Sequence, residues 1–153
     1  MSEHIIESGK FDELLQLEEA LKNDSFGEVK NPLLEGAKLH KGTVEDPIPF
    51  PHIEYSETVD KLMEAVYNFH IANPDYGMTD YMGVLERYGY TIINVDTIDV
   101  SKMDDKCLMA LFMALIRGER FHDGLILHSL EEGNVQRWLA RLREIVTGAR
   151  ITI

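Results

Sequence analysis

The fold is decided by Cys107-Leu-Met-Ala-Leu-Phe-Met-Ala-Leu-Ile116, which runs directly into Arg117-Gly-Glu-Arg-Phe-His-Asp-Gly124. Its ten apolar residues are too few to cross a bilayer, which needs about 20. They therefore predict a helix buried in a globular domain. The next eight residues contain two arginines, a histidine, an aspartate and two glycines. The stretch predicts a buried helix that is followed either by residues with a structural role or by a binding site.

Apolar residues recur at helical spacing on both sides of this stretch. The pattern predicts further helices over 11–23, from the N-cap Ser56 to Asn73, over 78–88, over 121–132 and over 134–147. Gly133 and Gly148 are expected to end the last two, since glycine favours the conformation that closes a helix. We therefore predict a mainly α fold, a compact bundle of about five to six helices.

Two short segments have a β-branched composition instead. Residues 90–95 and 149–153 are rich in Ile, Val and Thr and could pair as a small two-stranded β ribbon. Residues 24–52 are rich in Asn, Pro and Gly, which predict an irregular connection. We expect one structural unit, with an N-terminal helix and irregular arm over 1–46 and a main helical domain over 47–153.

Charge is spread unevenly along the acidic chain. The formal net charge is −12, of which residues 1–64 carry −9, residues 65–116 carry −4 and residues 117–153 carry +1. The acidic first half repels phosphate, which argues against nucleic acid as a partner. The last part holds six of the seven arginines. They are expected to neutralise acids of the same chain or of a second subunit, and an anion or nucleic-acid site is the alternative.

The compartment follows from the thiol and from the first residues. The single cysteine, Cys107, cannot form an intramolecular disulfide and lies in the apolar run. The first residues lack the basic and apolar regions of a secretory leader. We therefore predict a cytoplasmic protein with a buried structural thiol and no membrane partner.

The cluster after the apolar run has two interpretations. On a continuous helix Arg117, Arg120 and Gly124 share a face, because they are spaced i, i+3 and i+7. An arginine at the end of an apolar helix needs a carboxylate, carbonyl groups or a bound anion. One interpretation is an internal salt bridge to Asp123, Glu119 or an acid on the second helix. The other is a pocket in which both arginines bind a small anion.

Catalytic, metal and cofactor signals are sparse. His122 and Asp123 are weak candidates for an acid–base pair, without an identifiable nucleophile. His122 and His128 are six residues apart, which places them on different helix faces and is not a zinc spacing. The sequence also lacks G-x-S-x-G, P-loop and G-x-G-x-x-G motifs. We predict no metal and no cofactor.

Aromatic and glycine residues complete the candidate set. Structural roles in the motif or the core are expected for Phe121, Gly124, Gly133 and Trp138. The middle of the chain is rich in tyrosine, at positions 67, 76, 81, 88 and 90. These tyrosines predict core and rim packing, and an interface patch is the alternative.

Three groups of residues resemble an uncharacterised prokaryotic domain family of unknown function. They are Pro51-x-x-x-Tyr55-Ser56, then Arg117-x-x-Arg120-Phe121-x-Asp123-Gly124, and then Gly133 followed by Leu139-x-Arg141-Leu142. The resemblance covers roughly residues 47–143, and its central motif is R-x-x-R-F-x-[D/E]-G. It implies no activity, substrate or cofactor.

The observations favour a non-catalytic interaction or assembly protein that self-associates or binds another protein. The motivation is an acidic body, an arginine-rich end, abundant tyrosine and the lack of a catalytic set. The alternative is a small-anion-binding protein, or an enzyme with an Arg117/Arg120 clamp and His122/Asp123 as acid–base pair. A third hypothesis, a nucleic-acid mimic, rests on the acidic first half alone.

Overall fold

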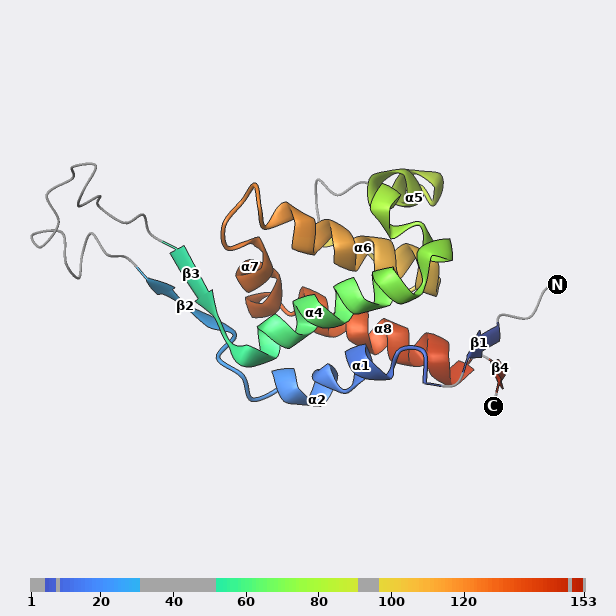
Figure 1. Ribbon diagram of the computed structural model, residues 1–153, viewed down its shortest axis with the longest axis horizontal. Helices are drawn as coiled ribbons and strands as arrows, with labels where there is room; N and C mark the ends of the chain where they lie inside the picture. Colours follow the sequence, from blue (N-terminus) through green and yellow to red (C-terminus); the bar gives the residue numbers. More distant parts are fainter. Residues whose placement is uncertain (1–4, 8, 31–51, 91–96, 149, 153) are drawn as a thin grey trace, which may run out of the picture.

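The computed structural model describes residues 5–7, 9–30, 52–90, 97–148 and 150–152. Most of this part is helical, and α6 (Asp105–Gly118) lies among the other helices (Figure 1). Helices α4 (Glu57–Ala72), α7 (Leu125–Glu131) and α8 (Asn134–Gly148) pack against it. The predicted mainly α fold is confirmed. Within the described ranges, no helix has the length and apolar character needed to cross a membrane.

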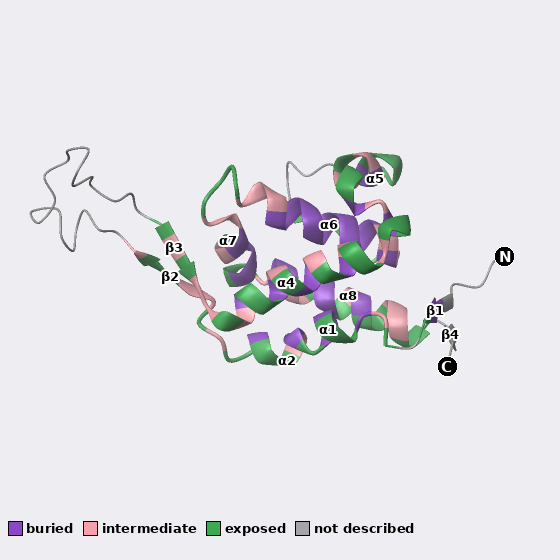
Figure 2. Ribbon diagram, viewed as in Figure 1, coloured by how far each residue is buried: buried purple, intermediate pink, exposed green. Residues whose placement is uncertain are grey.

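The apolar stretch forms the predicted buried helix. No residue from Cys107 to Ile116 is more than 6% exposed, and Figure 2 shows this part of α6 as buried. Asp104 caps the helix, because its carboxylate accepts a hydrogen bond from the Cys107 N–H at 2.8 Å. Burial raises the pKa of the Cys107 thiol to about 12, so the thiol is protonated near neutral pH.

Shorter helical segments surround this centre. They are α1 (Asp12–Leu15), α2 (Leu17–Leu21), α5 (Tyr81–Arg87) and the 3₁₀ turns η2 (Pro74–Tyr76) and η3 (Met78–Asp80). Helix α4 has its predicted cap, since Ser56 Oγ accepts a hydrogen bond from the Val59 N–H at 3.2 Å. Gly133 separates α7 from α8 with a φ of +79°, as expected for a residue that ends a helix.

Two predicted helix boundaries are wrong. The helix predicted over 11–23 is broken at Gln16 into α1 and α2, and the helix predicted over 121–132 begins only at Leu125. The break at Gln16 changes the direction of the chain, so all four leucines of α1 and α2 are buried. The prediction assumed one straight helix, whose single apolar face would not bury all four. Helix α7 starts late because the Glu119 side chain caps it at Gly124 and Ile126.

The described strands form two separate two-stranded sheets at opposite ends of the molecule (Figure 1). Strand β1 (Ile5–Glu7) pairs in parallel with β4 (Arg150–Thr152), and β2 (Gly27–Lys30) pairs antiparallel with β3 (His52–Tyr55). The strand predicted near residue 150 is present, and it pairs with β1, because the end of α8 places it beside the start of the chain. Strand β2 corrects the expectation of a wholly irregular 24–52. Residues 31–51 and 91–96 lie outside the described residues.

The N-terminal helices are attached by specific contacts. The Phe11 ring stacks on Phe69 with centroids 5.0 Å apart, which joins the start of α1 to α4. Arg143 Nε of α8 donates to Glu18 Oε1 of α2 at 2.6 Å. At least one arginine of the arginine-rich end therefore neutralises an acid of the same chain.

The edge-to-face pair of Phe112 and Trp138 connects α6 to α8, with buried rings whose centroids are 5.5 Å apart. We expect Trp138→Ala to lower the free energy of unfolding by about 3–5 kcal/mol, because the cavity left behind cannot fully close. Chemical denaturation followed by circular dichroism measures the change. Phe121→Ala is the matched control, because its ring is 89% exposed and its loss should cost less than about 0.5 kcal/mol. Equal losses in the two variants would contradict this account.

Candidate functional site

The site lies where α6 ends. Helix α6 stops at Gly118, and a turn over 119–124 leads into α7. A Cβ atom on Gly118 would lie 2.6 Å from Leu125 Cδ2, so glycine allows the two helices to approach closely here. Arg117, Arg120 and Gly124 consequently do not share one helix face, and that prediction is wrong.

Glu119 organises this turn. Its Oε2 accepts a hydrogen bond from the Gly124 N–H at 2.8 Å, and its Oε1 accepts one from the Ile126 N–H at 2.8 Å. Both donors belong to the start of α7, where backbone N–H groups lack partners inside the helix. A carboxylate at this position also interacts favourably with the positive end of the helix dipole. Helix α7 therefore begins where Glu119 can cap it.

Tyr55, at the end of β3, completes the arrangement. Its hydroxyl donates to Glu119 Oε1 at 2.8 Å and accepts from the Leu127 N–H at 3.3 Å. Burial, and then the hydrogen bond and negative charge of Glu119, raise the pKa of Tyr55 well above its usual value. We refer to Tyr55, Glu119 and Gly124 together as the α7 cap.

Gly124 meets two requirements at once. Its φ is +92°, in the left-handed region that favours glycine. A Cβ atom there would lie 3.0 Å from Ile53 Cδ1, so the glycine also gives room to a side chain of β3. The turn is thus held by β3 and by the start of α7 together.

The two arginines are not part of the α7 cap. Arg117 is half-buried, and its Nε atom is buried without a hydrogen-bond partner. Arg120 is exposed. Neither guanidinium forms an ion pair with any residue in the described ranges, and Glu119 is engaged by backbone N–H groups instead. The predicted salt bridge to Glu119 or Asp123 is therefore not seen in this part of the chain.

The tip of the turn faces solvent. Phe121 is 89% exposed, and His122 and Asp123 are also exposed. The ring of Phe121 is therefore not held by core packing, whereas Trp138 is fully buried. His122 and Asp123 remain candidates for an acid–base pair by position alone. Among the described residues, no three His, Cys, Asp or Glu side chains are grouped so that they could hold a metal ion.

Tyrosine–carboxylate hydrogen bonds also occur at the other end of α6. Tyr76 Oη donates to Asp105 at 2.5 Å, and both residues are buried. Tyr88 Oη donates to Asp104 at 2.8 Å. This hydrogen bond, with burial, raises the pKa of Tyr88 to about 12. Three tyrosines thus fix α6 and its two ends, which agrees with the prediction of core and rim packing for Tyr76 and Tyr88.

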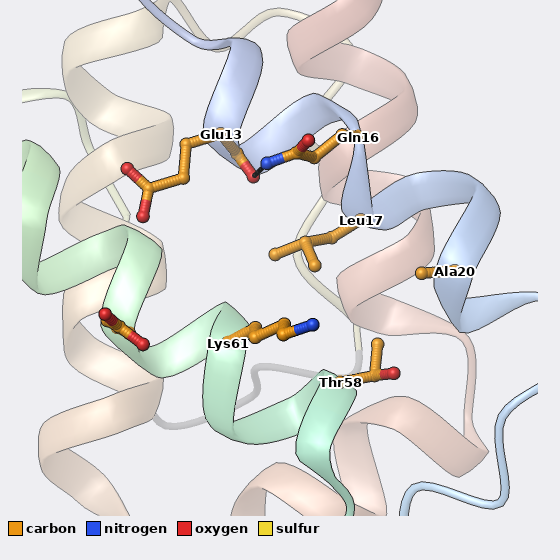
Figure 3. A pocket seen from close by; sticks show the side chains of 7 residues that line it. Glu13, Gln16, Leu17, Ala20, Thr58 and Lys61 are labelled. Carbon is orange, nitrogen blue, oxygen red and sulfur yellow. Dashed lines mark hydrogen bonds between the residues drawn. The ribbon is translucent and has the colours of Figure 1, made fainter.

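A separate groove of about 370 Å³ lies between α1–α2 and α4 (Figure 3). Its lining is mixed in charge and polarity, and consists of Glu13, Gln16, Leu17, Ala20, Thr58, Lys61 and Glu64. Glu13 Oε1 accepts from Asn68 Nδ2 at 2.9 Å, and Lys61 Nζ lies 3.4 Å from Glu57 Oε1. The groove thus has two carboxylates, Glu13 and Glu64, and one ammonium group, Lys61, around an apolar floor at Leu17. We call it the α2–α4 groove.

Residues 10–148 match the model of a family of unknown function, DUF6508. The chain belongs to this family. The match covers most of the chain, including the turn, the α7 cap and the groove, and confirms membership of an uncharacterised family. No curated protein and no solved structure matches the chain.

Two parts of this geometry escaped sequence-based prediction. Glu119 appeared only as an acid that could pair with Arg117, and Tyr55 only as part of a family motif. They are 64 residues apart, so no local spacing connects them. The α2–α4 groove joins α1–α2 to the distant α4, and its polar residues resemble any solvated helix face in sequence. The absence of a capping side chain at Gly124 was the one local sign that α7 needs a cap from elsewhere.

We expect Tyr55→Phe to lower the free energy of unfolding by about 1–2 kcal/mol at neutral pH, because Glu119 and the Leu127 N–H lose a hydrogen-bond partner. The difference from wild type should shrink as the pH rises above about 10. The folded-state pKa of Tyr55 is raised, so its stabilisation is complete below the unfolded pKa and is lost as pH rises towards the folded one. Denaturation at a series of alkaline pH values measures this.

The control is Tyr67→Phe, because no hydrogen bond of the Tyr67 hydroxyl is found in the described structure and its removal should leave stability nearly unchanged. A Tyr55→Phe variant as stable as wild type at neutral pH would show that the α7 cap does not hold the turn.

Proposed function

We propose that this DUF6508 chain is a non-catalytic protein-interaction module, with the turn over 119–124 as its docking point. The observation that carries the proposal is the Phe121 ring, 89% exposed on a turn that the α7 cap fixes. Folding gives no reason for this exposure, since the transfer of such a side chain out of water is worth about 1.5–3 kcal/mol. Burial against a partner would supply that gain.

The neighbours of Phe121 support the same function. Arg120 is exposed beside it, and aromatic residues and arginine are the types enriched at the centres of protein interfaces. Arg120 forms no ion pair in the described structure, so its exposed guanidinium group is available to partner carboxylates. Because the turn is already fixed, binding would cost little loop ordering.

The setting that we propose is the cytoplasm. Cys107 is the single cysteine, and it is buried and not part of a disulfide. A buried free thiol suits a reducing compartment. The expected partner is a second copy of the chain or another protein, rather than nucleic acid, because the net charge is −12.

The test replaces Phe121 with a photo-cross-linking phenylalanine analogue in the full chain, expressed in cells. We expect discrete adducts of higher mass after irradiation, because the exposed ring would lie inside an interface. Denaturing electrophoresis and mass spectrometry then identify the cross-linked protein and the contacted residue.

The matched control carries the same analogue at Ile71, which is 76% exposed on α4. The proposal predicts adducts from position 121 and not from position 71. It would be overturned by an absence of adducts at 121, or by the same set of adducts from both positions.

We propose as a second candidate a small-anion site, because the buried Arg117 Nε has no hydrogen-bond partner. In this function Arg117 and Arg120 hold the anion, and His122 with Asp123 are the candidate acid–base pair. The anion would supply the acceptor that the described residues do not provide.

If this candidate is correct, inorganic phosphate or sulfate raises the melting temperature at constant ionic strength, as linkage requires. Arg117→Lys should abolish the shift, because the lysine side chain has no equivalent of Nε in a planar guanidinium. Arg87→Lys, at an exposed position on α5, is the control and should keep the shift. No shift in the wild-type protein, or a shift that survives Arg117→Lys, would exclude the anion site.

A further inference from the structure

We infer that the α2–α4 groove is the docking site for the 119–124 turn of a second copy of this chain. The inference rests on the proposed function and names the partner of the same turn. It assigns Glu13 and Glu64 as the carboxylates that bind Arg120, and Leu17 with Ala20 as the surface that covers Phe121.

The size and lining of the groove suit such an occupant. Its volume of about 370 Å³ is near the lower end of the range of ligand pockets, about 300–1,000 Å³, which suits one or two side chains. Leu17 forms the buried floor and Ala20 lies beside it (Figure 3). The carbon stems of Gln16 and Lys61 add apolar surface at the walls. An aromatic ring from outside would therefore contact carbon while its charged neighbour stays near the carboxylates.

Charge complementarity favours the turn as that occupant. The Glu64 side chain forms no ion pair or hydrogen bond within the described part of the chain, and the Glu13 carboxylate accepts only from the neutral amide of Asn68. The turn offers Arg120, an exposed guanidinium that has no ion pair with any described residue, in a chain whose net charge is −12. Arginine pairs with carboxylates through two parallel hydrogen bonds, which fixes orientation as well as charge. The groove also contains the cation Lys61, and the turn also contains the acid Asp123.

The positions of the two surfaces require a second copy of the chain. The α6–α7 turn and α2 lie on opposite edges of the molecule in Figure 1, so a turn cannot reach the groove of its own chain. Docking therefore occurs between copies, either reciprocally about a two-fold axis or head to tail, in which case each added copy leaves one turn and one groove free. The reciprocal arrangement closes as a dimer, whereas the head-to-tail one forms a ring if its rotation closes and an open series if it does not.

The test uses two complementary double variants of the full chain. One disables the turn with Arg120→Glu and Phe121→Ser, and the other disables the groove with Glu13→Lys and Glu64→Lys. Each variant alone should be monomeric, with its apparent dissociation constant raised by about thirtyfold or more, as expected for loss of an interface anchor. Their mixture should form a one-to-one heterodimer of twice 17.5 kDa, because one intact turn meets one intact groove.

Light scattering and sedimentation velocity across a micromolar concentration series measure these masses, and circular dichroism checks that each variant is folded. Wild type should form species of dimer mass or above. A charge-matched control, Glu86→Lys with Glu132→Lys, changes exposed acids outside the groove and should associate like wild type. A monomeric wild type, a groove variant that associates normally, or a mixture without heterodimer would overturn the inference.

Failure of this inference is distinguishable from failure of the proposed function. Cross-linking at position 121 to a different protein, with a monomeric purified chain, would overturn the self-docking and leave the interaction module standing. Heterodimer formation in the mixture, together with adducts to a second copy at Glu13 or Glu64, would support both.

Discussion

The Glu119 carboxylate is the group on which the arrangement around the C-terminal end of α6 depends. It accepts hydrogen bonds from the Gly124 and Ile126 N–H groups and from the Tyr55 hydroxyl. One side chain therefore joins the end of α6, the start of α7 and the last residue of β3. Without it, the first N–H groups of α7 would lack acceptors, because Gly124 has no side chain that could cap the helix. Its negative charge also suits the positive end of the α7 dipole.

This constraint explains why the turn presents its remaining side chains to solvent. Glu119 is directed to the backbone, and Gly124 has the positive φ that brings the chain back towards Ile53. Arg120, Phe121, His122 and Asp123 are then left on the outside. The cap thus separates the motif into an internal acid that stabilises the fold and external residues that face solvent. Of the two interpretations that the sequence suggested, the internal structural one thus falls to Glu119, while the binding one concerns the exposed residues.

Helix α6 is held at both of its ends by hydrogen bonds between tyrosine hydroxyls and carboxylates. Tyr76 and Tyr88 bind Asp105 and Asp104 at the N-terminal end, and Tyr55 binds Glu119 at the other. The Tyr76 hydroxyl satisfies the buried carboxylate of Asp105, which would be costly to leave unpaired in an apolar core. The tyrosine-rich composition of the middle of the chain is thereby explained, in part, by the need to hold one very apolar helix in register.

The sequence by itself determined the helices whose apolar spacing is strong, the cap at Ser56, and the burial of Cys107 to Ile116, because these depend on contacts within a few residues. It also indicated a family of unknown function, which the match over residues 10–148 confirms. Only the tertiary structure decided that α7 starts at Leu125, that β4 pairs with β1, and that a groove with two carboxylates lies between α1–α2 and α4. The reason is physical: each of these features depends on groups tens of residues apart, whose meeting is determined by how helices pack and not by spacing along the chain.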